Sequence, residues 1–207
     1  MNFTTRIRFL VQNYGFLQGL KAVPIGIAVK IIALWDNLSA ETNRDLAFPL
    51  VVLFAALIAY EVAFRYYMHK FGNLRRTIRQ RLPEILISVS AGVLAYLAFA
   101  IDARFENAFS PLGLAIAVLL LLEYWRLSRP VQWRFLWDMA LWAAILLLVS
   151  LFPLLGFKRW WLSLGFQSQG IAILFIMGAS IVAMGFRSHT VLLTLLQTGK
   201  AEHESGL

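Results

Sequence analysis

Long apolar runs separated by short polar stretches dominate the chain. The runs cover residues 16–35, 46–66, 82–101, 110–125, 135–155 and 168–186. A backbone inside a bilayer has to satisfy its own hydrogen bonds, and an α-helix of about 20 residues crosses the hydrocarbon. The pattern therefore predicts an all-α fold, a polytopic transmembrane helical bundle that forms a single integral membrane domain over residues 1–207.

The first run is the least regular, because Lys21 and Lys30 lie inside it and Pro24 interrupts it. As a spanning helix it would carry Lys21 towards one headgroup region and Lys30 towards the other. As an interfacial helix it would place both lysines, together with Arg6 and Arg8, on the outer side, against the usual charge bias. We therefore expect six spans, or five if the first segment is interfacial.

Two basic stretches set the expected orientation. Residues 65–81 carry six cations and no carboxylate, and residues 126–134 are also basic. Loops rich in Lys and Arg are typical of the cytoplasmic side, which places both termini and the tail 187–207 in the cytoplasm. In the cytoplasmic basic loop 65–81, Arg75, Arg76 and Arg79 are the predicted contacts for lipid headgroups or for a partner.

Composition supports membrane insertion. Hydrophobic residues make up 60% of the chain and charged residues 14%, and the mean hydropathy is +0.71. Soluble domains have about 45–50% apolar residues and about 25% charged residues. The net charge of +8 is concentrated at predicted membrane edges. We therefore expect anionic lipid headgroups, and not nucleic acid, as partners. The expected location is a bacterial inner (plasma) membrane.

Four carboxylates lie near the predicted cytoplasmic ends of their spans, each with an arginine three or four residues away. The pairs are Glu61 with Arg65, Glu84 with Arg81, Glu123 with Arg126, and Asp138 with Arg134. This spacing puts both side chains on one helix face. In one interpretation each ion pair fixes helix depth and rotation. In the other the acids converge into an ion path. We favour the first and leave the second open.

Small residues mark two of the spans as close-packing helices. They are Ser88, Ser90, Ala91, Gly92, Ala95 and Ala98 in the run 82–101, and Gly178, Ala179, Ser180, Ala183 and Gly185 in the last run. After the last run, Val191, Leu192 and Leu195 indicate a separate short amphipathic helix, followed by a frayed tail over residues 201–207.

Catalytic and cofactor motifs are absent from the sequence. There is no cysteine, no metalloprotease helix motif and no phosphate-binding glycine loop. His69 and His189 fall at the same predicted edge of the membrane. They could be the axial ligands of a haem or solvated side chains, and we favour solvated side chains. Asp102 and Glu106 are interpreted as solvated residues of an outer loop. We predict no catalytic residue, no metal and no cofactor.

These observations favour a non-catalytic integral membrane subunit of a transport, channel or other multi-subunit membrane assembly. Its small-residue helix faces would pack against a second copy or against other membrane subunits. The alternative is a stand-alone ion channel or small-solute transporter that uses the carboxylate layer at the cytoplasmic side. A membrane enzyme acting on lipid headgroups ranks last, because the sequence offers no nucleophile or metal site.

Overall fold

The computed structural model describes residues 14–39, 47–71, 86, 90, 92–102, 109–128 and 137–205. In this part of the chain every regular element is a helix and no strand occurs, so the predicted all-α class is confirmed there. The elements are η1 (Gly19–Lys21), α2 (Ala22–Leu38), α3 (Ala47–Phe71), an unlabelled helix (Gly92–Asp102), α5 (Pro111–Ser128), α6 (Trp137–Leu151), α7 (Trp160–Ser163) and α8 (Gln169–Ser205).

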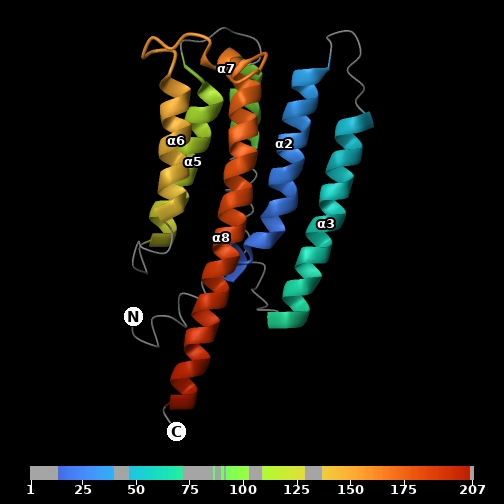
Figure 1. The fold of residues 1–207 in the computed structure, drawn as a ribbon, viewed down its shortest axis with the longest axis vertical. Helices are drawn as coiled ribbons and strands as arrows, with labels where there is room; N and C mark the ends of the chain where they lie inside the picture. Colours follow the sequence, from blue (N-terminus) through green and yellow to red (C-terminus); the bar gives the residue numbers. More distant parts are fainter. Residues whose placement is uncertain are drawn as a thin grey trace.

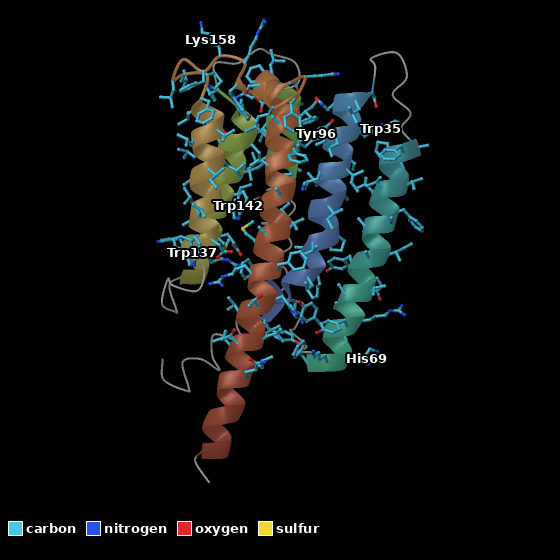
Figure 2. The ribbon with its side chains drawn as sticks, in the orientation of Figure 1. Trp35, His69, Tyr96, Trp137, Trp142 and Lys158 are labelled. Atoms are coloured by element: carbon cyan, nitrogen blue, oxygen red, sulfur yellow. The ribbon has the colours of Figure 1, made fainter. Side chains whose placement is uncertain are left out.

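The long helices stand roughly side by side in an elongated bundle. Figure 1 shows α3 at one edge, α5 and α6 together at the other, and α2 and α8 between them. We call the end that carries α7 the upper end and the opposite end the lower end. At the lower end α8 extends well beyond the other helices (Figure 1). Trp35 and Lys158 lie near the upper end, and Trp137 and His69 lie towards the lower end (Figure 2).

Within the described ranges, two helices are long and apolar enough to cross a membrane: α3, and residues Gln169–Gln197 of α8. Their surroundings differ. None of the residues in the most apolar window of α3 is buried, whereas 44% of those in the corresponding window of α8 are buried. The helix Gly92–Asp102 and α6 are shorter apolar helices. The bundle is therefore built around α8, and α3 lies on its outside.

Two helix ends differ from the sequence prediction. Helix α3 continues to Phe71, so residues 65–71 of the predicted basic loop are helical. Helix α8 is continuous to Ser205, and no separate amphipathic helix begins after the last span. The reason is that Val191 and Leu192 pack against Leu17 and Tyr67. This tertiary packing stabilises the helical conformation beyond the last predicted span.

The sequence predicts that Pro24 interrupts the first segment, but in the structure the helix continues through it. Pro24 occupies the first turn of α2, where the backbone N–H has no intrahelical partner and a proline costs little. The break comes earlier, at Gln18, which lies outside helical geometry between a short turn of helix and η1.

The central helix contact in the bundle is the antiparallel crossing of α2 and α8. A Cβ atom added to Gly26 would lie 2.8 Å from the carbonyl oxygen of Gly178, and one added to Gly185 would lie 2.8 Å from that of Gly19. Gly19 of η1 and Gly26 of α2 are seven residues apart, as are Gly178 and Gly185 of α8, so each pair recurs on one face. The small residues predicted to pack in the last span are thus used inside the chain itself.

Helices α5 and α6 form the second close pair. Gly113 of α5 lies directly against Ser150 of α6, and there is no room for a Cβ atom at this glycine. The main apolar cluster spreads from this pair to the upper half of α8, where Ala172 and Ile173 are fully buried. This packing gives the upper end of the bundle its core.

Candidate functional site

Two of the four sequence-predicted ion pairs lie in the described part of the chain, and both form. Arg65 Nε donates to Glu61 Oε1 at 2.9 Å, and Arg126 Nε donates to Glu123 Oε2 at 2.8 Å. The Glu61 side chain is 51% exposed and that of Glu123 is 33% exposed. Of the remaining predicted site residues, Asp138 is described, and six lie outside the described residues: Arg75, Arg76, Arg79, Arg81, Glu84 and Arg134.

The structure does not bring the two paired glutamates together. Glu61 is on α3 at one edge of the bundle, Glu123 is on α5 at the other edge, and α2 and α8 stand between them (Figure 1). Each carboxylate is neutralised by an arginine on its own helix. This arrangement suits pairs that set helix depth, and the use of these acids in an ion path stays a prediction.

Asp138 differs from the two paired glutamates. It is in the first turn of α6, where a negative charge is stabilised by the helix dipole. Its Oδ1 atom is buried and accepts no hydrogen bond in the structure. Arg187 of α8 is among the groups that act electrostatically on this carboxyl. Its predicted partner, Arg134, lies outside the described residues.

A buried tyrosine joins three segments at the lower end of the bundle. Tyr67 of α3 is fully buried, and its hydroxyl is 2.8 Å from His189 Nδ1 of α8. The same hydroxyl accepts a hydrogen bond from the Leu20 backbone N–H of η1 at 3.2 Å. Leu17 and Leu192 are buried beside it. The Tyr67–His189 junction thus fixes the lower parts of α3 and α8 against the chain that leads into α2.

Two lysines border the Tyr67–His189 junction. Lys21 Nζ lies 4.8 Å from the ring centroid of Phe64 and 5.9 Å from that of Tyr67. Lys70 Nζ donates to the Tyr66 hydroxyl at 3.0 Å. From the sequence, His189 is expected to be a haem ligand or a solvated side chain. Its tyrosine partner is not predictable from the sequence, because nothing in the local pattern relates two residues so far apart.

We expect Tyr67→Phe to lower the free energy of unfolding by about 1–2 kcal/mol, because it leaves the Leu20 N–H and His189 Nδ1 without their buried partner. Thermal unfolding in detergent measures the change. Tyr66→Phe is the matched control, since Tyr66 is 37% exposed and bonds only to the exposed Lys70 in the contacts described above. Equal midpoints for the two variants would contradict the prediction.

A second polar cluster lies at the upper end, where α5 begins. The Asp102 carboxylate accepts hydrogen bonds from the Ser110 hydroxyl and, at 3.1 Å, from the Leu112 N–H. Ser110 Oγ in turn accepts from the Gly113 N–H at 3.1 Å. The interpretation of Asp102 as a solvated loop residue was therefore wrong. Asp102 ends one helix and, with Ser110, satisfies the free N–H groups that begin the next.

The chemistry available in the described residues is that of caps, ion pairs and packing contacts. No group of three His, Cys, Asp or Glu side chains that could hold a metal ion occurs among residues the structure describes. The chain matches no protein-family model, no curated protein and no solved structure. The part of the chain that the structure describes is thus all-helical, with two helices long and apolar enough to cross a membrane.

Proposed function

We propose that the protein is a non-catalytic integral membrane subunit of a transport, channel or other multi-subunit assembly, with six spans and both termini on the cytoplasmic side of a bacterial inner membrane. The observation that carries the proposal is the outward position of α3. This 25-residue apolar helix packs mainly along α2 and η1, and it reaches α8 through Tyr67, its one buried residue.

The outer surface of α3 is large and apolar. Among its side chains, Leu50, Val51, Phe54 and Leu57 are each between 64% and 66% exposed. A soluble monomer does not expose so much contiguous apolar surface. In a bilayer such a surface faces lipid or another helix, and helix–helix packing is the contact that a subunit in an assembly would add.

The interior of the bundle favours a subunit over a stand-alone channel. The backbones of α2 and α8 touch at Gly26 and Gly178, so no water-filled path can run between these two central helices. Glu61 and Glu123 are bound to arginines on their own helices and lie on opposite sides of that contact. The proposed lipid contacts remain the arginines at positions 75, 76 and 79.

Two measurements test this proposal. The native mass of the protein in mild detergent, taken from its own membrane, is expected to exceed that of the 23.5 kDa chain by more than the bound detergent. A photo-crosslinking amino acid at Leu57 of α3, which is 64% exposed, is expected to give adducts with protein. The same group at Leu146 of α6, which is fully buried, is the control and should give none.

A different pair of results would overturn the proposal. The protein would have to be monomeric in its own membrane, and the purified chain would have to conduct ions across vesicles. If Glu61→Gln and Glu123→Gln then abolished the ion flux, the function would be that of a stand-alone channel built on the carboxylate layer.

A further inference from the structure

Lys30 of α2 is a partly buried cation that lies against α8. Its Nζ atom lies 4.8 Å from the centroid of the Phe175 ring, which belongs to α8. Phe175 is six residues from the start of α8 at Gln169, so the ammonium group lies about 9 Å from that end of the helix. Since α8 is one of the two helices able to cross a membrane, this depth falls within the apolar part of the span.

Helix α8 is shaped to admit this lysine. A Cβ atom at Gly178 would lie only 2.6 Å from Lys30 Cγ, so the glycine makes room for the aliphatic part of the side chain. The ammonium group has three hydrogen-bond donors. In the described part of the chain its contact is the Phe175 ring, and no acid pairs with it. A cation at such depth is costly unless it finds an anionic partner.

The free side of α2 lies next to Lys30. Gly26 and Ala33 face α8, while Trp35 stacks on Phe48 of α3 on the opposite side. Between these two sides an exposed apolar stripe runs along α2. It consists of Ile27, Ile31, Leu34 and Leu38, which are 45%, 38%, 40% and 78% exposed.

The spacing of the α2 stripe is that of a helix-packing seam. Its members follow one another at intervals of four, three and four residues, as the two core positions of a heptad do. Lys30 directly precedes Ile31 and therefore occupies a position that flanks the seam. Charged residues at flanking positions determine which helix pairs with the seam and in which orientation.

We propose that the α2 stripe binds a membrane helix of a partner subunit and that Lys30 pairs with an aspartate or glutamate carboxylate of that helix. The inference rests on the proposed function, because it names the chemistry of the partner that such a subunit would have. The stripe supplies apolar packing, and the carboxylate supplies a counter-charge that no described residue of the chain gives to Lys30. The Phe175 ring holds the ammonium group at the edge of the stripe.

The test uses the full chain in phosphatidylcholine vesicles and a synthetic transmembrane peptide of leucine and alanine with one central aspartate. Binding is followed by energy transfer between labelled protein and labelled peptide. The wild-type chain is expected to bind the aspartate peptide about tenfold more tightly than the same peptide with leucine at that position. Equal binding of the two peptides by the wild-type chain would overturn the proposal without the need for any variant.

Variants locate the effect at Lys30. Lys30→Met is expected to remove the preference for the aspartate peptide, and Lys30→Arg to keep most of it. Lys158→Met, at an exposed lysine of the upper end, is the control and should leave the preference unchanged. A preference that persists in a folded Lys30→Met chain, with an unaltered unfolding midpoint, would overturn the proposal.

The remaining outcomes separate this inference from the proposed function. If phosphatidylglycerol in the vesicles abolishes the aspartate preference, lipid phosphate is the ligand of Lys30 and the proposal fails. If the native protein lies in an assembly but shows no aspartate preference, this inference alone fails. If the native protein is a monomer in its own membrane, it is the proposed function that fails.

Discussion

Gly19→Ala is expected to destabilise the protein by about 3 kcal/mol, at the upper end of the range for overpacking a core. The added Cβ atom would overlap the backbone carbonyl oxygen of Gly185 and crowd the Ser188 side chain. A backbone atom cannot rotate away, so α2 and α8 would have to separate along their whole crossing. Unfolding in detergent, followed by helical circular dichroism, measures the loss of stability.

Gly92→Ala is the matched control for this prediction. No heavy atom of the described residues lies within 4 Å of a Cβ atom built at Gly92. The change should be neutral, or stabilising by up to about 1 kcal/mol because alanine is the better helix former. If Gly19→Ala and Gly92→Ala unfolded at the same midpoint, the close crossing of α2 and α8 would be wrong.

We expect Gly113→Ala to cost about 2 kcal/mol, because its methyl group would meet the Ser150 Oγ atom across the α5–α6 contact. The Ser150 hydroxyl is committed to a hydrogen bond with the Leu146 carbonyl oxygen of its own helix, and Ser150 is fully buried. The side chain therefore has no free direction in which to move. Chemical unfolding in detergent would report the cost as a shift in midpoint.

The second substitution Ser150→Ala should restore part of this loss. It removes the oxygen atom that the new methyl group meets, while the Ser110 N–H still donates to the Ser150 carbonyl at 3.0 Å. The two changes should thus be less costly together than the sum of their separate effects. Strictly additive costs would contradict direct contact between positions 113 and 150.

The sequence allowed reliable prediction where partners lie on one helix. The pairs Glu61–Arg65 and Glu123–Arg126 form because residues three or four apart share a helix face. The all-α class followed from the length of the apolar runs. These inferences need only the geometry of a single helix, and that geometry is the same whatever surrounds it.

The contacts between helices were not predictable from the same patterns. The Tyr67 hydroxyl and His189 Nδ1 are 122 residues apart in the chain. The contact between these two side chains depends on how α3 packs against α8, and local periodicity in the sequence does not predict that packing. The prediction for Asp102 was wrong for a related reason. Its carboxylate accepts a hydrogen bond from the Leu112 N–H of α5, a helix that the sequence pattern does not connect with Asp102.

The boundary errors have a different physical origin. Pro24 was treated as a break in the first segment, although a proline in the first turn of a helix removes no hydrogen bond. The end of α8 was placed too early because polar residues follow residue 186. Tertiary packing of Leu192 and Leu195 against Leu17 keeps that part of the chain helical.

The glycine contacts of α2 also constrain the order in which the protein is made. The residues that close over Gly19 and Gly26 are Gly185 and Gly178, which the ribosome adds roughly 150 residues later. Until then α2 has its α8-facing side open, and only α3 and the middle helices are present to shield it. The central pair therefore cannot form until α8 has been synthesised, and a chain that stops before α8 would leave this glycine face uncovered.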